Sequence, residues 1–142
     1  MNNMIAKRLL TVTALLETAT GLALLLSPPL VVALLLGASP DAPASLVVSR
    51  VAGAALLSLG ISCWLARDDG SSRAGRGLVA AVLFYNSATV VVLAHAAAGA
   101  GLSGPFLWPT VVLHASLAVW CIACLRAGPA HAARPRAIEP GN

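Results

Sequence analysis

The chain has 142 residues, of which 58% are hydrophobic and only 10% are charged, and this composition lies outside the range of ordinary soluble domains. The length suits one domain, and the apolar content indicates that this domain lies in a lipid bilayer. The net charge of +4 does not indicate nucleic-acid binding, because the nine basic residues are spread between apolar stretches and form no single phosphate-binding face.

The first apolar stretch, residues 9–27, is long enough to cross a bilayer and carries one carboxylate, Glu17, near its middle. A central carboxylate costs roughly 2.5–3.5 kcal/mol, and each Leu returns about 0.3–0.6 kcal/mol, so the leucines of the run offset it. Thr13, Glu17 and Thr20 follow the spacing of one helix face. Residues 1–8 and this run also outline a signal peptide, but the run is long for one and is followed by Ser-Pro-Pro, so we expect an uncleaved span.

Three further stretches have the length and hydropathy of membrane spans: 46–66, 78–98 and 106–126. Between the first two spans, the segment PLVVALLLG is apolar but too short to cross a core of about 30 Å. It predicts a short helix that ends at Gly37 and lies at the membrane interface or on the mouth of the bundle.

Two glycines of the second span, Gly53 and Gly60, are seven residues apart and share one helix face. In a membrane, such small residues permit close approach of a neighbouring helix. The sequence therefore predicts an all-α polytopic membrane protein, with four transmembrane helices in a bundle over residues 9–126 and a short interfacial helix after the first span. Residues 127–142, rich in Pro, Arg and Ala, are predicted to be a disordered tail.

The basic residues indicate an orientation. Those in the terminal segments and in the linker between the second and third spans are Lys7, Arg8, Arg67, Arg73, Arg76, Arg126, Arg134 and Arg136. Only Arg50 lies beside the other connectors, so the positive-inside rule predicts that the N- and C-termini, including residues 1–8 and the tail, are cytoplasmic. The compact Ala/Leu/Arg-rich chain has no prenylation or endoplasmic retention signal, which favours a bacterial inner (plasma) membrane.

A polar layer is predicted near the middle of the spans. Counting about 1.5 Å per residue from the cytoplasmic ends places Glu17, Ser58 and Asn86 at a depth of about 12 Å, with Tyr85 nearby. An ionisable group within a span is a candidate functional group. The layer either holds the helices together through hydrogen bonds or lines a ligand pocket. In the second case we expect these four residues to contact the ligand and Arg50 to lie at the entrance.

Two other polar levels suggest further chemistry. His95 and His114 are expected within about 5–9 Å of the periplasmic edge, where two imidazoles on facing helices can ligate a haem or another metal. Cys121 and Cys124 have redox spacing, and Cys63 is expected at a similar depth, so thiol–disulfide chemistry or soft-metal binding is conceivable. The alternatives are an interfacial or carbonyl-bonded histidine and cysteines that act as small buried side chains.

Several segments resemble those of small uncharacterised four-helix bacterial membrane proteins that are broadly DoxX-like. They are ETATGLALLLSP, RVAGAALLSLG with the following CW, LFYN, and GPFLWP with the following VVLH. The resemblance covers roughly residues 9 to 126. It implies a four-helix fold and, as in some DoxX-like proteins, association with oxidoreductase or thiol-stress systems, and it carries over no catalytic residue.

No segment matches a nucleotide-binding loop, a zinc-binding helix or a nucleophile elbow, so no reaction is predicted. Three functions are compatible with the sequence. The first is an accessory subunit or a binding protein for a lipophilic, quinone-like ligand, the second is a membrane redox enzyme component, and the third is an oligomeric transporter of small solutes or protons. An outward polar face favours a partner membrane protein or a second copy of the chain, an enclosed polar cavity favours ligand binding or catalysis, and a continuous passage favours transport.

Overall fold

The computed structural model describes residues 2–40 and 42–127 and contains five helices there. They are α1 (Asn2–Leu26), α2 (Pro28–Leu36), α3 (Pro43–Ala66), α4 (Arg73–Ala100) and α5 (Leu107–Arg126). Of these, α1, α3, α4 and α5 are long and apolar enough to cross a membrane, which confirms the all-α class and the four predicted long apolar helices. Of the predicted disordered tail, 127–142, only residue 127 belongs to the described residues, so the prediction of disorder falls outside them.

The short helix α2 ends where the sequence predicts, before Gly37. Pro28 occupies its first turn, where the missing backbone donor is not needed. Gly37 ends it with a φ of 74°, a left-handed conformation that favours glycine.

Ser72 caps α4, because its side chain accepts a hydrogen bond of 2.9 Å from the backbone N–H of Gly75.

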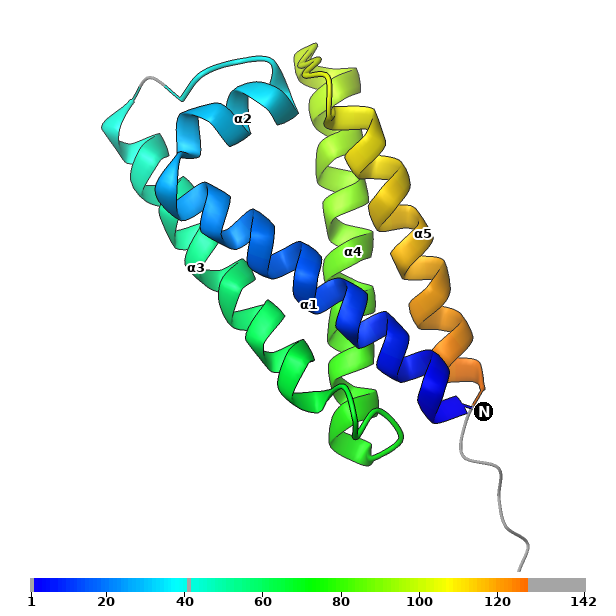
Figure 1. Cartoon of the computed structure of the whole chain (residues 1–142). Coiled ribbons are helices and arrows are strands. Elements are labelled where there is room, and N and C mark those ends of the chain that lie inside the picture. Colours follow the sequence, from blue (N-terminus) through cyan, green and yellow to red (C-terminus); the bar gives the residue numbers. More distant parts are fainter. Residues whose placement is uncertain (1, 41, 128–142) are drawn as a thin grey trace, which may run out of the picture.

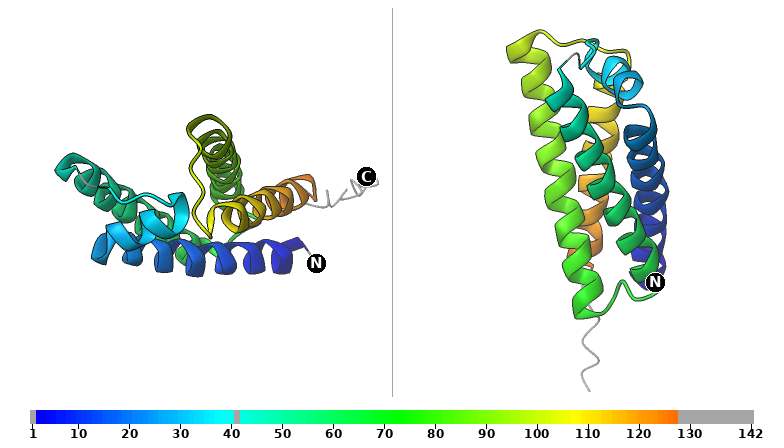
Figure 2. Two further views of the ribbon diagram at one scale, coloured as in Figure 1. Left: turned by 90° about the horizontal axis from the view of Figure 1, so that it is seen from above. Right: turned by 90° about the vertical axis from the view of Figure 1, so that its left-hand side faces the viewer.

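The long helices pack as two antiparallel pairs, α1 with α3 and α4 with α5, and α1 also contacts α5 (Figure 1). The start of α1, the α3–α4 connection and the end of α5 lie at one end of the molecule (Figures 1 and 2). We call this the basic end, because it carries Lys7, Arg8, Arg67, Arg73, Arg76 and Arg126. Helix α2 lies at the opposite end, where the two pairs diverge (Figure 1).

The contact between α1 and α3 depends on glycine. A Cβ atom added at Gly53 would lie 2.8 Å from the carbonyl oxygen of Gly21, and one at Gly60 would lie 2.9 Å from the backbone nitrogen of Thr18. Both distances are shorter than real Cβ contacts, so the two backbones touch along this face. The predicted close approach of a helix at Gly53 and Gly60 is therefore confirmed.

An apolar core joins all four long helices. It lies between the basic end and the pocket that is described in the next subsection. Its buried members are Leu9, Leu10, Ala14, Cys63, Val79, Val82, Leu117 and Cys121. Close packing of these side chains holds the two helix pairs together there, although the pairs diverge near α2 (Figure 1).

Polar contacts at the basic end connect the helices outside the apolar region. The Lys7 ammonium lies 2.6 Å from the Asp68 carboxylate, and it holds the pKa of that carboxyl below its usual range. The Arg76 guanidinium donates a hydrogen bond of 2.9 Å to the carbonyl oxygen of Leu125 at the end of α5. Because the Lys7–Asp68 pair is exposed, it aligns α1 with the α3–α4 connection and contributes little to stability.

Candidate functional site

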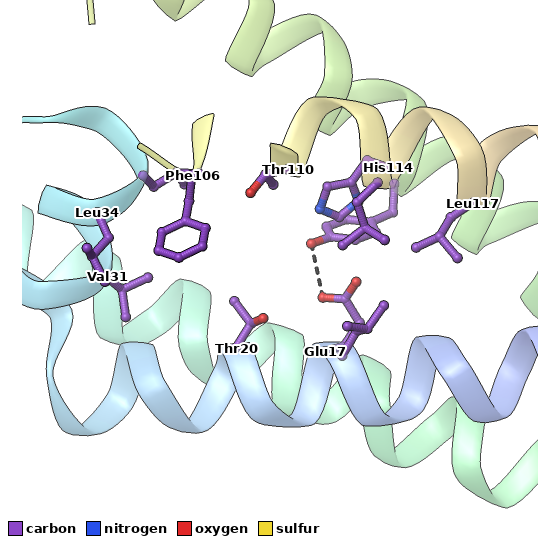
Figure 3. Close-up of a pocket in the computed structure, with 12 residues that line it drawn as sticks. Glu17, Thr20, Val31, Leu34, Phe106, Thr110, His114 and Leu117 are labelled. Carbon is purple, nitrogen blue, oxygen red and sulfur yellow. Dashed lines mark hydrogen bonds between the residues drawn. The ribbon is translucent and has the colours of Figure 1, made fainter. Parts of the chain in front are cut away.

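A pocket of about 240 Å³ lies between the two helix pairs, with α2 at one side of it (Figure 3). Helices α1, α2, α4 and α5 and Phe106, which directly precedes α5, all contribute to its walls. The lining residues are Leu16, Glu17, Thr20, Val31, Leu34, Leu35, Tyr85, Phe106, Thr110, Leu113, His114 and Leu117. Most of these side chains are apolar, and the polar ones come from α1, α4 and α5.

Helix α2 forms the apolar wall of the pocket at the end away from the core. The backbone N–H of Phe106 donates a hydrogen bond of 3.1 Å to the carbonyl oxygen of Leu34, which connects the end of α2 to the start of α5. A Cβ atom at the buried Gly104 would lie 2.4 Å from the same oxygen, so only glycine allows the connector to lie this close to α2. Of the two predicted positions for this helix, the structure places it on the mouth between the helix pairs.

Glu17 is almost fully buried, with 2% of its surface exposed, and it faces the pocket (Figure 3). The Tyr85 hydroxyl donates a hydrogen bond of 3.1 Å to Oε2 of Glu17. This bond connects α1 to α4, and thus one helix pair to the other. The second carboxylate oxygen has no partner within residues 2–40 and 42–127 and is free to contact a ligand.

Asn86 and His114 lie next to this bond. The Asn86 side-chain amide donates 2.8 Å to the carbonyl oxygen of Val82, and its oxygen lies 2.7 Å from Nδ1 of His114. The rings of Tyr85 and His114 meet edge to face, with centroids 5.6 Å apart. We call Glu17, Tyr85, Asn86 and His114 the polar cluster. The structure thus brings together Glu17, Tyr85 and Asn86, which were predicted for the middle layer, and His114, which was expected at another depth.

His114 joins the polar cluster because the helices are staggered. The depth count assumed that both helices begin at the same membrane plane. Along α4, Asn86 lies fourteen residues from Ala100, whereas His114 lies seven residues from the start of α5 at Leu107. At 1.5 Å per residue the end of α4 extends about 10 Å beyond the start of α5, so equal residue counts along the two helices do not give equal heights, and His114 lies level with Asn86.

Three other predicted site residues lie away from the pocket. Ser58 is exposed on α3, and its hydroxyl donates a hydrogen bond of 2.9 Å to the carbonyl oxygen of Ala54 in the same helix. Arg50 is exposed and does not line the pocket entrance. His95 is exposed and lies nine residues beyond Asn86, about 13 Å along α4. His95 and His114 therefore do not share a site, and residues 2–40 and 42–127 hold no cluster of three side chains suited to a metal ion.

The predicted cysteines belong to the core and not to the pocket. Cys63 and Cys121 are fully buried in the apolar core, and Cys124 is half-buried beside it. All three are free thiols. Their packing matches the alternative in which cysteine acts as a small buried side chain.

Sequence reasoning placed Thr20 on the same helix face as Glu17 but did not assign it to the site, and it did not select Thr110, although both threonines line the pocket. Thr20 shares a helix face with Glu17, and Thr110 precedes His114 by four residues on α5, so each lies one turn from a polar residue that was selected. Neither hydroxyl makes a hydrogen bond within residues 2–40 and 42–127. Thr13, on the same helix, is fully buried, and its Oγ1 likewise has no partner among the described residues.

No protein-family model, no curated protein and no solved structure matches this chain. The resemblance to DoxX-like proteins therefore stays a prediction. The chemistry of the site rests on its own atoms: a carboxylate, a phenol and an imidazole that face a small, mostly apolar pocket.

Proposed function

We propose that this chain is an integral protein of a bacterial inner membrane, with cytoplasmic N- and C-termini, that binds the polar headgroup of a lipophilic, quinone-like molecule. The observation that carries the proposal is the polar cluster at the side of a pocket with apolar walls. Ligand sites typically combine mostly apolar walls with a few polar groups that orient the ligand.

The surface of the four long helices supports membrane insertion. Large apolar side chains are exposed on each of them, for example Leu15 on α1, Val48 on α3, Phe84 on α4 and Val119 on α5. In water such a surface would favour aggregation, and in a bilayer it is covered by lipid. Six of the seven basic residues within the described chain lie at the basic end, which favours a cytoplasmic location for that end.

The size of the pocket suits a headgroup and not a whole lipid. Its volume of about 240 Å³ is below the roughly 300–1,000 Å³ that is typical for complete drug-sized ligands. A ring with one or two oxygen atoms fits such a space and leaves its hydrocarbon tail in the bilayer. The apolar side chains of α2 and Phe106 would contact the ring, while Glu17, Tyr85 and His114 of the polar cluster would contact its oxygen atoms.

Three observations favour ligand binding over the other predicted functions. The outward serines of α3, Ser49, Ser58 and Ser62, donate to carbonyl oxygens of their own helix, so they present no unsatisfied hydroxyl hydrogens to a partner subunit. The apolar core lies between the pocket and the basic end, which disfavours a polar passage through one copy of the chain. Catalysis by the cysteines is disfavoured because Cys63 and Cys121 are buried in that core.

Native mass spectrometry of the protein extracted from its own membrane tests the proposal. The wild-type protein should retain one lipophilic molecule, and a Ser58→Ala control should retain it equally, because Ser58 lies outside the pocket. In Glu17→Gln, the amide oxygen still accepts from Tyr85, but an NH₂ group replaces the free carboxylate oxygen, so retention should fall by about tenfold. Equal retention in Glu17→Gln, or only ordinary phospholipid in the wild-type protein, would contradict the proposed site.

A further inference from the structure

We infer that Asn86 holds the neutral imidazole of His114 as the tautomer protonated on Nδ1, so that Nε2 offers an acceptor to the pocket and selects a headgroup with a hydroxyl donor. The tautomer follows from the protein alone. The ligand class rests on the proposed function and makes it more specific, because it distinguishes a hydroxylated headgroup from one that carries only carbonyl or ether oxygens.

The first step is the orientation of the Asn86 amide. Asn86 is fully buried on α4, and one end of its amide lies 2.8 Å from the carbonyl oxygen of Val82. A carbonyl oxygen can only accept a hydrogen bond, so the NH₂ group must face it. The opposite orientation would place two oxygen atoms against each other in a buried site, at the cost of an unsatisfied acceptor. The amide oxygen therefore faces His114.

The second step is the proton on His114. Nδ1 of His114 lies 2.7 Å from the Asn86 amide oxygen. That oxygen can only accept, so Nδ1 must carry the hydrogen. A neutral imidazole has one N–H group, so its Nε2 then has a free lone pair. The edge-to-face contact with Tyr85 packs against the ring and helps keep this orientation.

The third step is the access of Nε2 to a ligand. His114 lines the pocket, as Figure 3 shows, and 8% of its surface is exposed. Nε2 has no hydrogen-bond partner in residues 2–40 and 42–127. It is also not one of the polar atoms of these residues that are both fully enclosed and without a partner. Nε2 is therefore accessible, and because His114 lines the pocket, we infer that its lone pair faces the cavity.

The donors of the two polar side chains next to Nε2 are already used, and the free hydroxyls of Thr20 and Thr110 lie elsewhere on the pocket wall. The hydroxyl hydrogen of Tyr85 is donated to Glu17, and the Nδ1 hydrogen of His114 is donated to Asn86. A ligand carbonyl or ether oxygen placed at Nε2 would bring two acceptors together, whereas a ligand hydroxyl would donate to it. At Nε2, therefore, the arrangement favours a ring hydroxyl, as in the dihydroxy, reduced form of a quinone-like ring, over a carbonyl oxygen of the oxidised form.

Nitrogen-15 NMR of the histidine-labelled protein in detergent tests the tautomer without any ligand. At mildly alkaline pH, His114 should show a protonated Nδ1 and an unprotonated Nε2, with its signals assigned by their loss in His114→Gln. Asn86→Ala should shift the population toward the other tautomer, while Ser58→Ala should leave it unchanged. A wild-type spectrum with the proton on Nε2 would overturn the inference even if Asn86→Ala does not fold.

Binding of two matched probes tests the ligand class. A prenylated hydroquinone should bind the full-length protein at least about tenfold more tightly than the corresponding quinone or the dimethyl ether, because only the hydroquinone donates to Nε2. Asn86→Ala should reduce this preference without abolishing binding of the hydroquinone. Equal affinity for all three probes would refute the preference for a donor. Failure of all three to bind, together with the expected NMR tautomer, would instead overturn the proposed ligand-binding function.

Discussion

Replacing Gly53 with alanine tests whether the backbone contact between α1 and α3 is as close as the structure shows. The new Cβ atom would lie 2.8 Å from the Gly21 carbonyl oxygen, 2.9 Å from Cβ of Leu24 and 3.0 Å from the Leu25 nitrogen. Ordinary contacts of a Cβ atom begin at 3.4 Å. Two of the three atoms belong to the backbone and cannot rotate away, so the helices must separate by about half an ångström.

The expected effect combines two opposing contributions. Overpacking of this kind costs about 1–3 kcal/mol, whereas Gly→Ala in a helix returns about 0.5–1 kcal/mol by itself. Gly77 on α4 provides the matched control, because a Cβ atom there would meet nothing within 4 Å. Gly77→Ala should show only the favourable contribution. The free energies of unfolding of the two variants should therefore differ by about 1–3 kcal/mol. A difference of about 1.4 kcal/mol within this range changes the unfolding equilibrium constant about tenfold.

Unfolding of the purified protein in mixed micelles, with increasing sodium dodecyl sulfate and detection by circular dichroism, measures this difference. Gly53→Ala should unfold at a lower fraction of sodium dodecyl sulfate than the wild type, and Gly77→Ala at the same or a higher fraction. If Gly53→Ala were as stable as Gly77→Ala, the two helices would not be in backbone contact, and the reasoning would be refuted.

Two further predictions concern the ends of the molecule. Gly104→Ala places a Cβ atom 2.4 Å from a carbonyl oxygen at the end of α2, so it should displace this wall of the pocket. Retention of the native ligand in mass spectrometry should therefore fall. Undiminished retention would show that ligand binding does not need α2 in this position. Because Lys7 holds the pKa of Asp68 below its ordinary value of about 3.9, the small stabilisation from this exposed pair is present above that value and is lost as pH falls through the lowered pKa. Lys7→Gln should raise the NMR titration midpoint of Asp68, and an unchanged midpoint would exclude the pair in solution.

The helices could largely be predicted because their signals are local. The length and hydropathy of each apolar run indicated a helix long enough to cross a membrane, and α2 ends at Gly37 because only a residue that tolerates a positive φ allows that turn. The spacing of Gly53 and Gly60 indicated a close helix contact, because one helix face is defined by residue spacing alone. The partner helix in that contact could not be derived in this way.

The candidate site was predicted only in part, because it depends on how the helices are rotated and staggered. Glu17, Tyr85 and Asn86 do lie together, but Ser58 at the same counted depth points out of the molecule. His114, counted to a different depth, completes the polar cluster. A residue count along each helix contains neither the rotation of a helix about its axis nor its offset from its neighbours.

By itself, therefore, the sequence determined that four long apolar helices form and that a carboxylate lies within the first of them. It could do so because apolar surface and backbone hydrogen bonding act within a single segment. Only the tertiary structure decided that Glu17 meets Tyr85, that Asn86 orients His114, and that α2 forms a wall of the pocket beside them. These contacts join residues far apart in the chain, and they arise from packing between helices, which no single segment encodes.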